Sequence, residues 1–132
     1  MSYPARLFTT LIRTHHITSR KKLHRVKKAA SHRGIPYVLV RYGGSPGIMY
    51  AECRDESSLN SWVSTVHELR YKDFQCVQKP TAETVLAQGN EDSIGGNAPF
   101  NEVESVAEFG TVMERKGLER WWKLGMGYEK AK

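Results

Sequence analysis

The first 51 residues of this 132-residue chain contain no aspartate or glutamate, and the first acidic residue is Glu52. The same stretch carries ten lysines and arginines, whereas the remaining residues carry ten basic and fourteen acidic side chains. The formal net charge of +6 is therefore the sum of +10 and −4. A fold does not require this asymmetry, so we expect a positive field over one region that attracts phosphate groups.

Other absences narrow the class of protein. The two cysteines, Cys53 and Cys76, form no C-x-x-C pair, so neither a disulfide-built scaffold nor a zinc site is expected. No apolar run approaches the roughly 18 residues of a membrane span, and the N-terminus has no apolar stretch typical of a secretory signal. We therefore expect a nuclear or cytoplasmic protein that is not secreted and has no membrane partner.

The length of the chain predicts a single domain that spans residues 1–132, because the hydrophobic content of 39% is enough for one core at this size. Residues 7–17 mix β-branched and apolar side chains, which is typical of a strand. Residues 20–33 predict a helix, since Leu23, Val26 and Ala30 recur at helical spacing. Hydroxyl residues can cap its start, and a glycine can end it.

A hairpin and a second helix follow. Residues 37–42 and 48–53 are strand-like and are separated by a Gly-Gly-Ser-Pro-Gly turn. Residues 55–69 show apolar helical spacing, and residues 71–78 alternate as a fourth strand. The order β-α-β-β-α-β over residues 7–78 predicts an α+β fold, specifically a ferredoxin-like antiparallel sandwich with both helices on one face.

The pattern changes after this core. Residues 79–101 are polar and glycine-rich and predict a flexible loop. Residues 102–126 return to helical spacing and predict C-terminal helices packed on the core. We expect one of the adjacent tryptophans, Trp121 and Trp122, to point inward and the other partly outward. In the third strand, residues 47–51 match an RNA-stacking motif only incompletely, and Tyr50 is the ring at a stacking position. We expect this ring to belong to the core.

Three motifs in this order resemble one family. Residues 14–19 (THHITS), followed by a basic helix, resemble a family start written SHHIYSK. Residues 44–48 (GSPGI) resemble its GKPG(I/V) hairpin, and residues 109–124 resemble its closing helix, where a glycine precedes an aromatic-rich segment. Over most of residues 10–126 the chain is similar to the C-terminal domain shared by RWD-domain-containing protein 2 and the spliceosomal pre-mRNA-processing factor 3.

This resemblance implies a ferredoxin-like fold. The spliceosomal members further imply binding of a base-paired small nuclear RNA with single-stranded flanks, within a ribonucleoprotein, whereas the RWD-containing members imply no activity. The chain departs from the family at Ser45, where the family's turn usually carries a lysine, and this removes one possible phosphate contact.

The basic residues of the predicted first helix form the candidate site. If its apolar stripe faces the sheet, much of the opposite arc is basic, and such a strip can neutralise RNA phosphates. His15 and His16 at the end of the preceding strand, and His24 and His32 on the helix, add hydrogen-bond donors. The candidate RNA-binding residues are His15, His16, Arg20, Lys21, Lys22, Arg25, Lys28 and Arg41.

Other interpretations remain open. The basic strip is also compatible with a nuclear-import signal or with a solvated face that has no partner. The chain is also compatible with a protein-interaction module that uses the hairpin or the C-terminal helices and binds no RNA.

Catalytic and metal sites are not expected. His16-Ile17-Thr18 is half of the paired His-x-Thr motif of two-histidine phosphoesterases, but the second half is missing. The glycine-rich turn joins two strands and is no P-loop. On a strand His15 and His16 would point to opposite faces, one buried and one exposed, so they would not share a metal ion. We therefore predict a monomeric, non-catalytic protein without cofactor or metal that binds RNA or a ribonucleoprotein partner.

Overall fold

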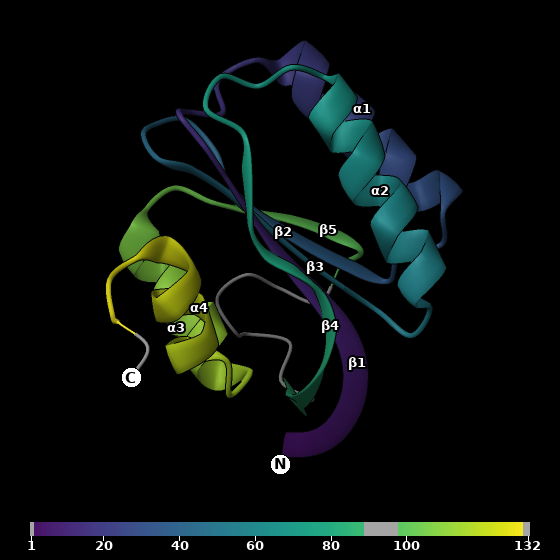
Figure 1. Cartoon of the computed structure of the whole chain (residues 1–132), viewed down its shortest axis with the longest axis vertical. Helices are drawn as coiled ribbons and strands as arrows, with labels where there is room; N and C mark the ends of the chain where they lie inside the picture. Colours follow the sequence, from purple (N-terminus) through teal and green to yellow (C-terminus); the bar gives the residue numbers. More distant parts are fainter. Residues whose placement is uncertain (1, 89–97, 131–132) are drawn as a thin grey trace.

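The computed structural model describes residues 2–88 and 98–130 (Figure 1). In chain order the elements are β1 (Ser2–Thr14), α1 (Arg20–His32), β2 (Tyr37–Arg41), β3 (Gly47–Cys53), α2 (Glu56–Glu68), β4 (Gln75–Gln88), β5 (Phe100–Val103), α3 (Val106–Arg115) and α4 (Glu119–Met126). The predicted α+β class is confirmed by this mixture of a sheet and helices.

The five strands form one mixed sheet in the order β4-β1-β3-β2-β5. β1 runs antiparallel to both β3 and β4, and β2 runs antiparallel to β3. β5 is parallel to β2 and adds a further edge strand. β1 and β3 are therefore neighbours inside the sheet, with β4 and β2 on either side of them.

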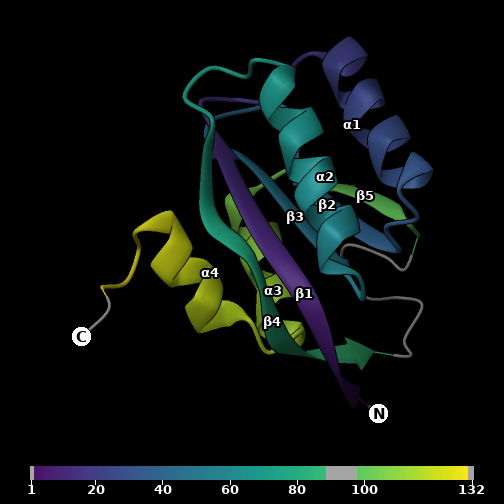
Figure 2. The ribbon, with the colours of Figure 1, turned by 45° about the vertical axis from the view of Figure 1, so that its right-hand side comes forward.

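Each face of the sheet is covered by a pair of helices, α1 with α2 and α3 with α4 (Figure 2). Successive residues of a strand point to opposite faces, so each strand supplies both cores. In β3, Met49 and Ala51 pack with α1 and α2, whereas Ile48 and Tyr50 pack with α3 and α4. The sheet thus has two hydrophobic cores, and α1 lies over the first of them.

The local sequence explains where α1 begins and which of its sides faces the sheet. Ser19 caps the helix, and its side chain accepts a hydrogen bond from the amide of Lys22 at 3.1 Å. The predicted apolar stripe, Leu23, Val26 and Ala30, is buried. Trp62 of α2 is fully buried beside it, and its indole nitrogen donates to the carbonyl of Val26 at 3.3 Å. These contacts fix which side of α1 faces outward.

The prediction of a flexible loop over residues 79–101 is wrong at both ends of this range. Residues 79–88 continue β4, and Phe100–Val103 form β5. The reason is that β1 begins at residue 2, so its first half pairs with the second half of β4, as in the pair Ala5 and Val85. A polar strand of this kind forms through its partner rather than through its own pattern. The centre of the predicted loop, residues 89–97, lies outside the described residues.

The second core contains the aromatic residues of the C-terminal helices. Trp122 is buried, whereas Trp121 is partly buried, as expected for this pair. Trp121 stands edge-on against Tyr50, whose ring is completely buried. The expected core position of Tyr50 is therefore confirmed, and its ring is not exposed for stacking on a base. Within the described part of the chain, no helix has the length and hydrophobicity to cross a bilayer.

Candidate nucleic-acid interface

The side of α1 opposite its buried stripe is a continuous basic surface. At about 100° per residue, the five basic and histidine side chains centred opposite the stripe occupy about 100° of arc, whereas the exposed Lys27 lies on the same flank as Arg20, near the ring of Phe100. We call this set the outer α1 surface; its members are Lys21, His24, Arg25, Lys28 and His32, and all are exposed. The helix itself contains no acidic residue.

The cations at the centre of the outer α1 surface have no acidic partner. Among the described residues, no carboxylate forms an ion pair with Lys21, Arg25 or Lys28. Their side chains therefore remain available to neutralise phosphate groups from outside, which releases counterions from a nucleic acid. The outer α1 surface therefore brings together three of the eight candidate residues that the sequence predicts.

Arg20 lies on the flank of α1 and is already paired. Its guanidinium donates to both carboxylate oxygens of Glu102 in β5, at 2.8 and 2.9 Å, and stacks 3.7 Å above the ring of Tyr42. The hydrogen bond to Glu102 raises the pKa of Arg20 above its usual value. The positive charge of Arg20 is thus compensated, although the side chain stays exposed.

Lys22 points to the other flank of α1. Its Nζ donates to the carbonyl of Arg70 at 3.4 Å and lies 5.2 Å from the ring centroid of Tyr71. The side chain is half-buried against the turn between α2 and β4. Lys22 therefore borders the outer α1 surface but contributes less exposed charge to it.

Arg41 is not part of the same surface. It alternates with Val40, which faces α1, so Arg41 points to the opposite face of the sheet. There its Nε donates to the carbonyl of Glu104 at 3.0 Å and its Nη1 to the carbonyl of Pro46 at 3.1 Å. Arg41 thus ties the β2–β3 turn to the segment after β5.

His15 and His16 lie in the turn between β1 and α1. The expectation that one of them is buried is wrong, because β1 ends at Thr14 and strand alternation no longer applies; both are exposed. Nδ1 of His15 is 3.5 Å from the carboxylate of Asp73, and Nδ1 of His16 is 3.4 Å from the hydroxyl of Thr18. Neither histidine ring is therefore free of a neighbour, but both remain open to a ligand.

Two members of the outer α1 surface, His24 and His32, were expected from the sequence as additional donors but are not among the eight candidate residues. His24 and His32 precede and follow Lys28 by four residues, so all three lie in one row along the helix. This spacing was visible in the sequence, and it would have extended the candidate list to the end of α1. Among the described residues, no three His, Cys, Asp or Glu side chains gather closely enough to hold a metal ion.

Comparisons with known proteins add no relative to this picture. No protein-family model matches the chain, and the search of curated proteins finds no match. Inferences about function therefore depend on the geometry of the outer α1 surface and on the residues around it.

Proposed function

We propose that this protein is a non-catalytic RNA-binding module that contacts the phosphate backbone through the outer α1 surface. We also propose that its core is a ferredoxin-like β-α-β-β-α-β unit, to which β5, α3 and α4 are added. The observation that carries the function is the row of exposed cations on α1 with no acidic partner among the described residues. Such a surface attracts polyanions without reading base sequence.

RNA fits the described surface better than a lipid bilayer does. An interfacial membrane helix presents large apolar side chains beside its basic residues. The apolar stripe of α1 is buried, and the large hydrophobic side chain that is exposed in the described residues is Tyr128, after α4. The outer α1 surface therefore offers charge without an apolar anchor.

The buried position of Tyr50 favours contacts to phosphates over stacked bases. A sheet that reads single-stranded RNA exposes aromatic rings on its central strands. Here α3 and α4 cover that face, and Trp121 lies against Tyr50. We propose a structured RNA with a single-stranded flank as the ligand, within a nuclear or cytoplasmic ribonucleoprotein that processes RNA, in line with the family resemblance.

A charge-reversal variant tests this proposal. In Lys21→Glu/Arg25→Glu/Lys28→Glu, three cations at the centre of the outer α1 surface become anions, so affinity for RNA should fall at least about tenfold. The measurement is fluorescence anisotropy of a labelled RNA hairpin with a single-stranded 3′ tail. We expect micromolar or tighter binding by the unmodified protein at low salt.

A matched control separates local contacts from overall charge. The variant Arg54→Glu/Lys79→Glu/Lys130→Glu changes the net charge from +6 to 0, as the α1 variant does, but at exposed positions away from α1. It should retain binding within about threefold. Equal losses in both variants would contradict a specific role for α1, and no binding at low salt would contradict the proposal as a whole.

Removing the acid that pairs with Arg20 should strengthen RNA binding. Glu102→Gln frees the Arg20 guanidinium beside the outer α1 surface, and we expect affinity to rise about twofold to fivefold at low salt. The control is Glu119→Gln, which removes an exposed acid of α4 that pairs with Lys123 at 3.8 Å. Unchanged affinity in Glu102→Gln, or an equal rise in both variants, would show that this ion pair does not compete with RNA.

The alternative is a protein-interaction module without RNA binding. Its suggested surfaces were the hairpin and the C-terminal helices, but the apolar sides of α3 and α4 are buried on the sheet. The two functions differ in their response to salt, since phosphate contacts weaken steeply as salt rises and an apolar interface does not. Nothing in the described residues favours the protein-interaction function over RNA binding.

A further inference from the structure

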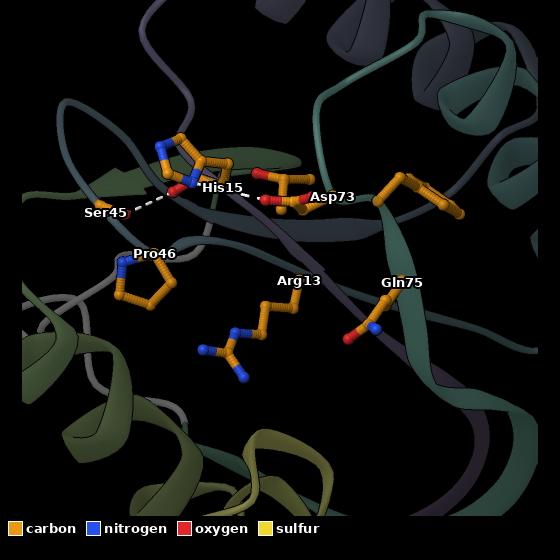
Figure 3. A pocket seen from close by; sticks show the side chains of 8 residues that line it. Arg13, His15, Ser45, Pro46, Asp73 and Gln75 are labelled. Atoms are coloured by element: carbon orange, nitrogen blue, oxygen red, sulfur yellow. Dashed lines mark hydrogen bonds and ion pairs between the residues drawn. The ribbon is translucent and has the colours of Figure 1, made fainter.

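The end of the sheet where β1 finishes holds a polar hollow that the outer α1 surface does not include. Its volume is about 380 Å³, and its walls come from three segments: the end of β1, the β2–β3 turn and the residues at the start of β4 (Figure 3). Ligand sites in proteins have volumes of roughly this size and upward. The hollow is therefore large enough for a small polar ligand.

Hydrogen bonds hold the three walls together. The amide of His15 donates to the carbonyl of Lys72 at 2.8 Å, which joins the end of β1 to the segment before β4. The hydroxyl of Ser45 donates to the carbonyl of His15 at 2.6 Å, and the amide of Gly43 donates to the carbonyl of Ile17 at 2.7 Å. The shape of the hollow is thus set before any ligand binds, which lowers the entropic cost of binding.

Arg13 supplies an unpaired positive charge to this hollow. It is exposed, and no carboxylate among the described residues pairs with it. Asp73, the acid in the lining, lies against His15 instead, at 3.5 Å. Arg13 stands directly opposite Gln75 in the β1–β4 ladder, so both side chains leave the same face of the sheet. In Figure 3 the Arg13 guanidinium lies between Pro46 and Gln75.

The free donors of the hollow determine which anion fits. The hydroxyls of Thr14 and Ser45 already donate to main-chain carbonyls. Arg13 has five N–H donors in a planar fork, and the amide of Gln75 has two more. A phosphate has more acceptor oxygens and a larger negative charge than a carboxylate, so it can accept from both groups while a further oxygen faces the solvent.

We propose that this hollow binds a phosphate group, with Arg13 as the main contact and Gln75 as a second donor. The phosphate can belong to a small phosphate ester or to the end of an RNA, because both present the same chemistry to Arg13. The proposal goes beyond RNA binding by α1, since it holds whether or not the outer α1 surface binds RNA.

The experiment is a nuclear magnetic resonance titration of the ¹⁵N-labelled chain at constant ionic strength. The probes are inorganic phosphate and adenosine monophosphate, with adenosine and acetate as controls. We expect both phosphate probes to shift the amide signals of residues 13–15 and 73–75, and neither control to do so. No shift at millimolar phosphate, or an equal shift with acetate, would overturn the proposal.

Single substitutions assign the binding to the hollow. Arg13→Ala should weaken phosphate binding by about tenfold or more, whereas Arg6→Ala, on the same strand and outside the lining, should leave it unchanged. Asp73→Asn should strengthen binding about twofold to fivefold, because it removes a negative charge from the lining. Asparagine tolerates the positive φ of 55° at this position, so the fold is kept. Binding that persists in Arg13→Ala would overturn the assignment.

A final titration distinguishes the two sources of the phosphate group. The same RNA hairpin is titrated with a 5′-phosphate and with a 5′-hydroxyl end. Tighter binding of the phosphorylated end that Arg13→Ala abolishes would support an RNA end as the ligand. Equal binding of both RNAs, with a clear response to adenosine monophosphate, would support a small phosphate ester. The probes without RNA keep this proposal separate from the one for α1, because failure of RNA binding would not change their result.

Discussion

Replacing Lys116 by alanine is expected to lower the free energy of unfolding by about 2–3 kcal/mol, because it leaves the carboxylate of Glu52 without its cation at a nearly buried site. Nζ of Lys116 is 2.9 Å from this carboxylate, and the two side chains are only 14% and 13% exposed. The hydroxyl of Tyr50 donates to Oε1 of Glu52, the oxygen that Lys116 contacts, at 2.7 Å. The Nζ of Lys116 also lies 4.0 Å from the ring centroid of Tyr37. Chemical denaturation at neutral pH measures the loss.

The tyrosines near this ion pair act as neutral partners. Burial, and then the charge of Glu52, raise the pKa of both Tyr37 and Tyr50 above the usual value. Tyr50 therefore stays protonated and donates to Glu52. Because Lys116 follows α3 and Glu52 lies in β3, the pair helps to fix the C-terminal helices on the sheet.

Two further variants separate burial from the mere loss of a lysine. Lys123→Ala removes a lysine whose ion pair with Glu119 is exposed, so its cost should be about 0.5 kcal/mol or less. The double variant Lys116→Met/Glu52→Gln removes both charges and keeps an acceptor for Tyr50, and it should recover at least half of the lost stability. A loss in Lys116→Ala no larger than that in Lys123→Ala would contradict this account.

Substituting Gly47 by alanine is expected to cost about 3 kcal/mol, since the added methyl group has no space. Gly47 begins β3 opposite Thr14, and a Cβ there would collide with the Thr14 hydroxyl and approach the Cγ1 of Ile17 to 2.5 Å. It would also lie 2.9 Å from the main-chain carbonyl carbon of His16, which cannot move aside like a flexible side chain. The variant should therefore displace the turn that precedes α1.

Gly34→Ala is the matched control for this substitution. Gly34 has a positive φ of 67°, but a Cβ would meet no atom within 4 Å, so only backbone strain of about 1–2 kcal/mol is expected. Thermal and chemical denaturation of both variants compare the two costs. If Gly47→Ala were as stable as the unmodified protein, the close packing of β3 against the turn before α1 would be contradicted.

Local signals in the sequence were sufficient to predict α1. Its cap, its apolar stripe at Leu23, Val26 and Ala30, and the glycine after it all lie within sixteen residues, Ser19 to Gly34, and the structure has each of them in place. The outward side of the helix followed from the same spacing, since burying one stripe exposes the other side. The central cations of the candidate site were predictable for this reason.

Features that depend on distant partners were not predictable. β5 forms only by pairing with β2, and Arg20 meets Glu102 from a position 82 residues away. Arg41 carries the same charge as Arg20 and lies outside the candidate site, because strand alternation points it to the other face. A single sequence shows the charge of each residue, but not which carboxylate or carbonyl neutralises it.

The salt dependence of RNA binding tests the role of the outer α1 surface most directly. The affinity of the unmodified chain and of Lys21→Ala/Arg25→Ala/Lys28→Ala for the tailed RNA hairpin is measured over a series of salt concentrations. If the three side chains contact phosphates, the log–log slope becomes shallower by about 2–3 in the variant, at 0.7–0.9 per contact. An equal slope in both proteins would contradict the account, since it would mean that these cations touch no phosphate.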